Sequence, residues 1–311
     1  MKPPTYLFSC PQMKQLAEKI AGSCPAVELA EIQWKDFEDG FPNIKIEQAK
    51  SLRNKPVFFL ASFETPGDIF KQLSVIYELP RLSIESLTVV LPFYPTGTME
   101  RVEEEGEVAT ASTLARMLSN TPNSQSGPLQ VVIFDIHALQ ERFYFSDNVI
   151  PRLETAVPLL IHRIQNTSDV AIAFPDEGAW KRFGKMFDGY PLITCHKVRE
   201  NQQRVISIKD GEPAGKHVVI VDDLIMTGGT IRACRQALKK AGAAAISAYV
   251  THGVFPKQSW KHFVGEDFET FWITDSCPGT AAAVTNTPPF EVLTLQKPIR
   301  MIIEGTDNDD K

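Results

Sequence analysis

The chain has 311 residues, of which 43% are hydrophobic and 23% are charged. At roughly 150 residues per domain, this length predicts two domains, and the composition is typical of a globular protein rather than a disordered one. There are 32 Lys and Arg residues against 38 Asp and Glu residues, which gives a net charge of −6. This excess of acid argues against nucleic-acid binding, which depends on neutralising phosphates, but allows an anionic substrate held by a few local cations.

No apolar run approaches the roughly 20 residues that a membrane helix needs, so we expect no membrane association. The first residues, MKPPTYLFSC, lack the apolar core and cleavage site of a signal peptide. The cysteines are Cys10, Cys24, Cys195, Cys234 and Cys277. Their scattered spacing, without a C-x-x-C pair, argues against a disulfide framework or a zinc cage. We therefore expect a soluble protein in the reducing cytoplasm.

Short apolar strands alternate with helical patterns along the whole chain. In the first half, strands are expected over 5–8, 57–61, 87–91 and 131–134, and helices over 12–21, from 66 onward and over 108–118. In the second half, strands are expected over 170–174, 192–195, 218–221 and 246–250, and helices over 179–187 and 231–241. Such alternation with fully apolar strands predicts an α/β fold of mainly parallel sheets flanked by helices.

The strand–helix pattern runs through twice, with a break over 147–158. We therefore expect two domains, 1–150 and 151–311.

The sharpest chemical signal is the segment 218–230, VVIVDDLIMTGGT. Its β-branched run leads to the carboxyl edge of a parallel sheet, where open α/β sheets bind ligands. Asp222 and Asp223 follow the run, and then Thr227, Gly228, Gly229 and Thr230 open a helix. Glycines permit close backbone approach, and N–H groups at a helix start bind phosphate. Two carboxylates beside such a cradle suit a sugar phosphate, because vicinal hydroxyls donate hydrogen bonds to carboxylates.

The alternative interpretation of this segment is a surface turn with two solvated acids. It is disfavoured because strand, acids, glycines and helix occur together in the required order. The chain has no G-x-x-x-x-G-K-[ST] loop and no G-x-G-x-x-G after a strand, so simple nucleoside-triphosphatase and dinucleotide-binding functions lose their usual support.

The segment VVIVDDLIMTGGT closely resembles the phosphoribosyl-diphosphate motif of type I phosphoribosyltransferase folds. Over nearly its whole length, from FEDG at 37–40 to THGVF at 251–255, the chain resembles the ribose-phosphate diphosphokinase family, most closely its class II plant-like branch. The resemblance implies two phosphoribosyltransferase-type domains. It also implies transfer of the diphosphoryl group of ATP to the C1 hydroxyl of ribose 5-phosphate, with Mg²⁺ required and AMP released.

The resemblance also implies roles for residues outside the motif. FDIHALQ matches a D-x-H segment, which gives His137, after Asp135, at the ATP phosphates and the metal; FPDEG gives Asp176 as a second residue on the metal side. Without the resemblance, His137 would be a structural histidine and Asp-Glu-Gly an ordinary turn. Magnesium prefers oxygen ligands, so His137 would act mainly on phosphate or through water.

CHKVRENQQR matches the family's catalytic loop and gives Lys197 and Arg199. Two cations that close over a transferring phosphoryl group stabilise the charge that spreads in an in-line displacement. Taken alone, the segment would be a solvated basic turn.

FEDGF at 37–41 resembles a loop that a neighbouring subunit contributes to the adenine site, which gives Phe37 and Asp39 as ATP contacts and implies a homo-oligomer. Phe41 stands where an acid is common. In the segment TMER, which matches a nucleotide-contacting Arg-Gln-Asp-Arg, only Arg101 keeps its type. Met226 replaces the acid that usually precedes the threonine of the sugar-phosphate loop.

A further departure is VEEEGEV at 102–108. Class I members carry a basic stretch there, linked to activation by phosphate and inhibition by ADP, so we expect a phosphate-independent enzyme. Two alternatives remain open. One is a phosphoribosyltransferase that consumes phosphoribosyl diphosphate, and the other is a catalytically silent regulatory subunit. The retained Lys197, Arg199 and His137 favour the active diphosphokinase over both.

Overall fold

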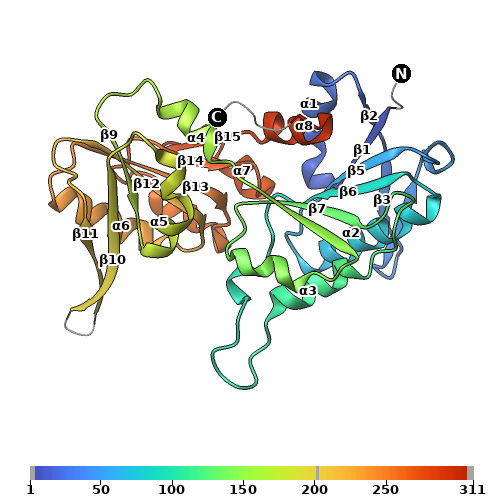
Figure 1. Cartoon of the computed structure of the whole chain (residues 1–311), viewed down its shortest axis with the longest axis horizontal. Helices are drawn as coiled ribbons and strands as arrows, with labels where there is room; N and C mark the ends of the chain where they lie inside the picture. The colour runs from blue at the N-terminus through green and yellow to red at the C-terminus, as the bar shows by residue number, and fades with distance from the viewer. Residues whose placement is uncertain (1–3, 201–202, 307–311) are drawn as a thin grey trace. The chain divides into compact units, whose positions relative to one another are not determined.

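A computed structural model describes residues 4–200 and 203–306, with the side chains of these ranges apart from 197–200 and 203–205. The chain divides into two compact units, which are described separately (Figure 1). Unit 1 comprises Met1–Glu154 together with Leu295–Lys311, and unit 2 comprises Thr155–Thr294.

Unit 1 is built on a six-stranded parallel sheet in the order β2-β1-β5-β6-β7-β8. Its strands are β1 (Thr5–Ser9), β2 (Val27–Leu29), β5 (Pro56–Leu60), β6 (Ser86–Val90), β7 (Leu129–Phe134) and β8 (Val149–Glu154). Its helices are α1 (Lys14–Ser23), α2 (Pro66–Glu78), α3 (Thr110–Ser119) and α8 (Gln296–Glu304). A separate antiparallel hairpin consists of β3 (Ile32–Asp36) and β4 (Pro42–Ile46).

Unit 2 is built on a seven-stranded sheet in the order β11-β10-β9-β12-β13-β14-β15. Its strands are β9 (Val170–Phe174), β10 (Leu192–Glu200), β11 (Gln203–Asp210), β12 (His217–Ile225), β13 (Ala245–Gly253), β14 (Phe271–Thr274) and β15 (Phe290–Leu293). Its helices are α4 (Val157–Ile164), α5 (Glu177–Phe183), α6 (Gly229–Lys240) and α7 (Pro278–Val284). All neighbours are parallel except the β10–β11 pair.

Both faces of the unit 2 sheet are covered, because alternate residues of its central strands enter two different cores. On β12, Val218 and Ile220 pack into the core that contains α6, whereas Val219 and Val221 pack into the core that contains α4 and α5. Burial on both faces explains why this strand is a continuous β-branched run rather than an alternating pattern. The expected fold class, α/β with mainly parallel sheets flanked by helices, is confirmed.

The division of the chain differs from the single break expected near residue 150. That position lies inside β8, which pairs with β7 along its whole length, so unit 1 continues to Glu154. Helix α8 returns to unit 1 and packs against α1. There the Gln296 side-chain amide donates to the Lys19 carbonyl at 2.9 Å. Sequence periodicity could not show this return, because it depends on a contact between residues 277 positions apart.

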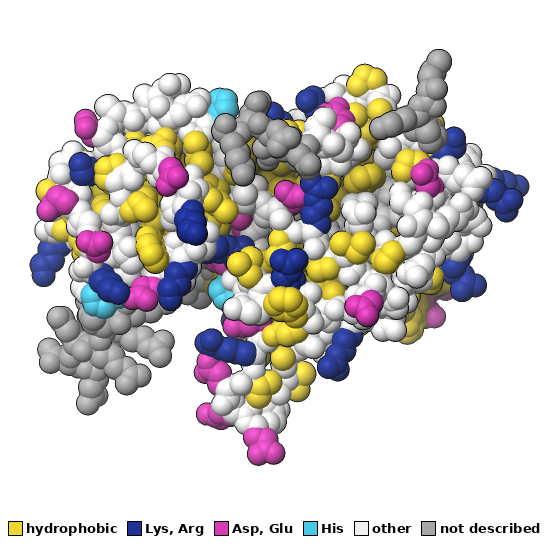
Figure 2. Space-filling view, in the orientation of Figure 1, with side chains coloured by type: hydrophobic (Ala, Val, Ile, Leu, Met, Phe, Trp, Pro, Cys, Tyr) yellow, Lys and Arg dark blue, Asp and Glu magenta, His cyan; other side chains and the backbone are white. Residues whose placement is uncertain are grey.

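On the face shown in Figure 2, Lys and Arg side chains are interspersed with Asp and Glu, as the composition implies. Within the described residues, no helix is both long and apolar enough to span a bilayer.

Candidate active site

The two acids of the central motif lie within β12 rather than after it. Asp222 pairs in register with Val250 of β13, and the strand continues to Ile225. β12 pairs with β9 as far as Ile220, which lies opposite Ala173. β12 therefore extends past the end of its neighbour and carries both carboxylates beyond the sheet edge at which β9 stops.

Successive residues of a strand face opposite sides, so the two acids have different surroundings. Asp223 follows the α5 side, is only 6% exposed, and has a carboxylate oxygen 3.7 Å from an Arg182 guanidinium nitrogen. Arg182 also lies over the Phe183 ring, 5.0 Å from its centroid. Asp222 lies on the α6 side and is partly exposed. The contact with Arg182 thus fixes the position of Asp223, whereas Asp222 reaches the surface on the other side of the strand.

The loop after β12 has the geometry of an anion cradle. Gly228 has a φ of +81° and is the N-cap of α6, and Thr227 and Gly229 are exposed while Thr230 is partly exposed. A hydrogen bond holds the start of this loop in place, because the Ser259 hydroxyl donates to the Met226 carbonyl at 2.9 Å. The N–H groups at the start of this 12-residue helix can therefore meet a phosphate at the surface.

Gly228 is required at its position for two reasons. Its positive φ is unfavourable for other residues, and a Cβ built there would lie 2.2 Å from the Phe263 ring. Gly229 lacks both constraints, since a Cβ there meets nothing within 4 Å.

We therefore expect Gly228→Ala to lower the free energy of unfolding by roughly 2–4 kcal/mol, from backbone strain and overpacking together. Gly229→Ala is the matched control and should change it by less than about 1 kcal/mol. Urea denaturation followed by circular dichroism measures both variants. Equal stabilities would show that Phe263 moves aside without cost.

Asp176 lies at the same edge of the unit 2 sheet. It follows β9, the neighbour of β12, and serves as N-cap of α5 by accepting a hydrogen bond from the Ala179 N–H at 3.1 Å. Among the described residues, no three His, Cys, Asp or Glu side chains are grouped so as to hold a metal ion. The carboxylates at this edge do suit Mg²⁺, which takes oxygen ligands and is commonly held by one or two carboxylates plus substrate phosphates.

Lys197 and Arg199 lie on β10, whose backbone pairs Lys197 with Ile206 and Arg199 with Arg204 of β11. The strand predicted from the sequence ends at Cys195. In the structure, antiparallel pairing with β11 extends it to Glu200. The side chains of both cations lie outside the described part of the structure, so their roles stay predictions.

His137 lies in unit 1, after β7, and is exposed. The chain turns there through Asp135, which is 3% exposed and has a φ of +37°, with its N–H bonded to the Glu154 carbonyl at 2.9 Å. The loop at Gly97 packs against this turn, since a Cβ at Gly97 would lie 3.2 Å from that of His137. Arg101 follows the same loop and pairs with Glu103 at 2.9 Å. His137 and Arg101 are thus presented by adjoining loops at one end of the unit 1 sheet.

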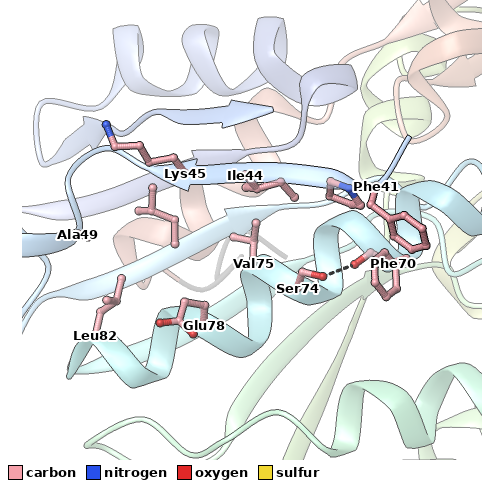
Figure 3. A pocket seen from close by; sticks show the side chains of 11 residues that line it. Phe41, Ile44, Lys45, Ala49, Phe70, Ser74, Val75, Glu78 and Leu82 are labelled. Carbon is pink, nitrogen blue, oxygen red and sulfur yellow. Dashed lines mark hydrogen bonds between the residues drawn. The ribbon is translucent and has the colours of Figure 1, made fainter. Parts of the chain in front are cut away.

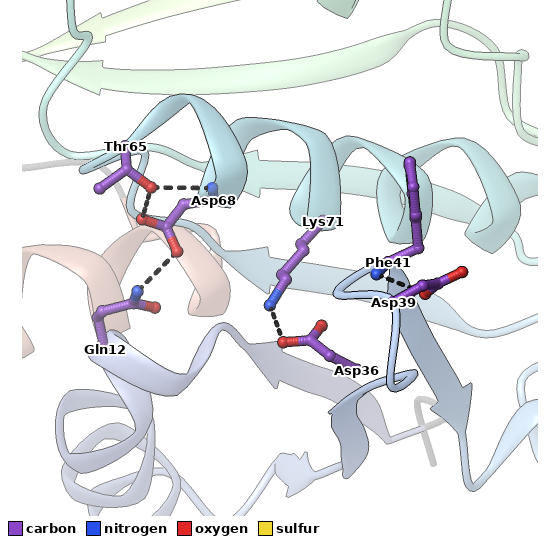
Figure 4. A network of polar contacts seen from close by, with 7 residues as sticks. All are labelled: Gln12, Asp36, Asp39, Phe41, Thr65, Asp68 and Lys71. Carbon is purple, nitrogen blue, oxygen red and sulfur yellow. Dashed lines mark hydrogen bonds and ion pairs between the residues drawn. The ribbon is translucent and has the colours of Figure 1, made fainter.

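Phe37 and Asp39 lie in the turn of the β3–β4 hairpin. Figure 4 shows Asp39 beside Phe41 there. Asp39 accepts a hydrogen bond from the Phe41 N–H at 3.1 Å, which closes the turn, and Phe37 is 56% exposed. An ion pair of 2.7 Å between Asp36 and Lys71 ties the hairpin to α2. The sequence analysis did not identify this hairpin, because its polar, partly exposed strands lack the apolar runs of the main sheet.

A pocket of about 610 Å³ lies between the hairpin and α2 (Figure 3). Its lining is mostly apolar, with Phe41 and Phe70 at one end and Ile44 and Val75 along it. Phe37 is not among its lining residues. The pocket is therefore a different feature of the hairpin from the turn that carries the expected ATP contacts.

Within unit 2 the structure brings together Asp176, Asp222, Asp223 and the loop over 227–230 at one sheet edge. Within unit 1 it presents His137 and Arg101 together, and Phe37 and Asp39 on the hairpin. The residue that sequence reasoning missed is Arg182. The sequence shows that Arg182 is six residues after Asp176. Only the packing of α5 against β12 shows that its guanidinium reaches Asp223.

The expected phosphoribosyltransferase type of both domains is confirmed by the similarity of the chain to known families and structures. A model of the N-terminal domain of ribose phosphate pyrophosphokinase matches residues 5–121, and a phosphoribosyl transferase domain model matches 192–278. The chain is 56% identical to mitochondrial ribose-phosphate pyrophosphokinase 3 of Spinacia oleracea, over 93% of this chain and 74% of that protein. It is 53% identical to chloroplastic ribose-phosphate pyrophosphokinase 3 of Oryza sativa subsp. japonica, over 96% of this chain and 75% of that protein.

Among solved structures, the phosphoribosylpyrophosphate synthetase from Mycobacterium smegmatis has a TM-score of 0.83 to this chain at 24% identity. The match covers 98% of this chain and 99% of that chain, which shows a shared fold.

The expected cytoplasmic location is wrong on this comparison. Relatives at 53–56% identity carry mitochondrial or chloroplastic names. Scattered free cysteines and an acidic surface do not distinguish these compartments from the cytoplasm, so composition could not decide the location.

Proposed function

The chain belongs to the ribose-phosphate pyrophosphokinase family, and we propose that it transfers the diphosphoryl group of ATP to the C1 hydroxyl of ribose 5-phosphate. The products are 5-phosphoribosyl 1-diphosphate and AMP. The observation that carries this proposal is the edge of β12, where two carboxylates precede a helix-start phosphate cradle. The family resemblance stated from the motifs is confirmed, and the enzyme names of relatives up to 56% identical favour an active enzyme over a silent subunit.

Each part of the β12 edge suits one part of the sugar phosphate. Asp222 and Asp223 accept hydrogen bonds from ribose hydroxyls, and the N–H groups over 227–230 hold the 5-phosphate. This orientation leaves the C1 hydroxyl free to attack the β-phosphorus of ATP. A new bond forms between O1 and that phosphorus, the bond to the bridging α,β oxygen breaks, and AMP leaves with that oxygen while the hydroxyl proton passes to solvent.

The remaining site residues act on the nucleotide. Lys197 and Arg199 neutralise the charge that develops on the transferring group, which lowers the barrier of an in-line displacement. His137 and Arg101 contact the ATP phosphates, and Phe37 and Asp39 contact adenine. Asp176 and His137 would hold Mg²⁺, which when bound would neutralise charge on the ATP phosphates. We infer a homo-oligomer in which one subunit lends its Phe37 turn to a neighbour.

The direct test supplies purified protein with ribose 5-phosphate and Mg-ATP and measures release of AMP. AMP formed in equal amount to phosphoribosyl diphosphate supports the proposal. If no AMP forms, the silent-subunit alternative replaces it. If the protein instead consumes phosphoribosyl diphosphate in the presence of a base, it is a phosphoribosyltransferase.

Independence of inorganic phosphate is expected from the acidic segment over 102–108. The Glu107 carboxylate accepts hydrogen bonds from the N–H groups of Glu103 and Glu104, at 2.8 and 3.3 Å, and these bonds lower the pKa of Glu107. The segment therefore stays negatively charged near neutral pH and repels phosphate. We expect initial rates in phosphate-free buffer to change by less than about twofold on adding phosphate, and ADP to inhibit only by competition with ATP.

Initial rates with and without phosphate, and with ADP at saturating ATP, test this expectation. Several-fold activation by phosphate, or ADP inhibition that saturating ATP does not relieve, would contradict it.

A further inference from the structure

A segment that follows β13 supports the loop between β12 and α6. This support segment, residues 254–263, binds the two backbone carbonyls that directly precede the phosphate cradle. The Ile225 carbonyl accepts hydrogen bonds from the first two N–H groups of the segment, at 3.2 and 3.3 Å. The Met226 carbonyl accepts one from the Ser259 hydroxyl at 2.9 Å. The chain is therefore held on the support segment immediately before it enters the cradle.

The turn that presents Ser259 has a fixed and unusual conformation. Phe255, Lys257 and Gln258 have φ values of +45°, +54° and +61°. Residues other than glycine rarely adopt a positive φ, and they keep it where the surrounding contacts determine the conformation. Here Phe255 is only 3% exposed, and its ring centroid lies 5.7 Å from that of Phe263 in an edge-on contact. The turn is thus anchored in the core of unit 2.

The hydrogen bond from Ser259 determines the direction of the next backbone N–H group. In a trans peptide the C=O and N–H groups lie in one plane and point in opposite directions. The peptide between Met226 and Thr227 is trans, and its carbonyl points toward Ser259. The Thr227 N–H therefore points away from the support segment. Within the described residues it donates to no protein acceptor, and Thr227 is exposed, so this N–H can meet a ligand.

We propose that Ser259 is a positioning residue for ribose 5-phosphate. Its hydroxyl orients the peptide between Met226 and Thr227 so that the Thr227 N–H donates to the 5-phosphate. This inference rests on the proposed function for the identity of the ligand. Ser259 is only 8% exposed and acts through the Met226 carbonyl. Because this contact uses a backbone atom, it does not depend on which side chain stands at position 226.

Loss of the hydroxyl should weaken binding of the sugar phosphate. A donor that is oriented before the ligand arrives binds more tightly, because it loses little conformational freedom on binding. Without Ser259 as donor, the Met226 carbonyl turns toward water, and the Thr227 N–H on the same peptide turns away from the cradle. The contribution of one hydrogen bond corresponds to a roughly threefold to tenfold change in affinity.

The effect should appear in KM rather than in kcat. The 5-phosphate takes no part in bond formation or breakage, so its contacts are the same in the ground state and in the transition state. Removal of such uniform binding raises KM and leaves kcat unchanged.

Isothermal titration of Ser259→Ala with ribose 5-phosphate and with Mg-ATP tests the inference. We expect the Kd for ribose 5-phosphate to rise about threefold to tenfold and that for Mg-ATP to change by less than about twofold. Ser259→Cys keeps the size of the side chain but is a weaker donor, so its affinity should be intermediate. Ser247→Ala is the matched control. It removes a buried hydroxyl that lies 2.9 Å from His217 Nε2, at the opposite end of β12 from the cradle.

The control separates positioning from general destabilisation. Ser247→Ala should keep the wild-type affinity for ribose 5-phosphate within about twofold, even where thermal unfolding shows a loss of stability. An equal loss of affinity in Ser247→Ala and Ser259→Ala would overturn the positioning role. If Ser259→Ala does not fold, the comparison rests on Ser259→Cys, and a wild-type affinity in that variant would likewise overturn the role.

Steady-state rates of AMP release complete the test. In Ser259→Ala, the KM for ribose 5-phosphate should rise in parallel with Kd, and kcat should stay within about twofold of the wild-type value. A fall in kcat with unchanged KM would contradict the inference. Wild-type binding of ribose 5-phosphate with an unaltered Ser259→Ala variant would overturn this inference alone. A wild-type chain that binds no ribose 5-phosphate would overturn the proposed function together with it.

Discussion

Replacing Lys197 or Arg199 with alanine is expected to lower kcat about a hundredfold in each case and to leave the KM for ribose 5-phosphate nearly unchanged. Both residues lie on β10, which is adjacent to β9 and its Asp176 edge. A cation that acts on charge developing in the transition state contributes little to binding the ground-state sugar phosphate, so its loss appears in kcat.

Steady-state kinetics of AMP release, with each substrate varied in turn, checks this expectation. Lys240→Ala is a suitable control, because it removes the same charge at the far end of α6 from the phosphate cradle. A rise in KM with unchanged kcat would make the β10 segment a binding element rather than a catalytic one.

Replacing the paired acids should affect the sugar more than the nucleotide. A hydrogen bond to a charged group contributes about 1.5–3 kcal/mol, so Asp222→Asn and Asp223→Asn should each weaken ribose 5-phosphate binding by roughly 10- to 100-fold. ATP binding should change by less than about threefold. Isothermal titration of each variant with each ligand measures both effects.

The two variants should differ in stability. Asp223 is nearly buried beside Arg182, so its neutralisation leaves a guanidinium with 14% side-chain exposure without that carboxylate partner, whereas Asp222 is partly exposed. Thermal unfolding should therefore show the larger loss for Asp223→Asn. Asp169→Asn makes the same charge change at the opposite end of β9 and serves as control. A variant that weakens ATP more than ribose 5-phosphate would place the acids on the nucleotide side.

The sequence alone determined the class of fold and the central motif. Apolar β-branched strands such as 218–221 can only be buried on both faces, and this property, repeated along the chain, is enough to predict parallel sheets flanked by helices. The order of strand, acids, glycines and helix in 218–230 is local, so it predicted the phosphate cradle without knowledge of any contact. Such local patterns can be interpreted from the sequence because their conformation depends on residues that are close together in the chain.

Only the tertiary structure decided features that join distant residues. Three such features depend on partners that sequence periodicity does not specify. They are the β3–β4 hairpin, the extension of β12 past Ile220, and the return of α8 to unit 1. The same reason explains why Arg182 was missed. Its significance arises from a separation of 3.7 Å from Asp223, and this distance is set by how α5 packs against the sheet.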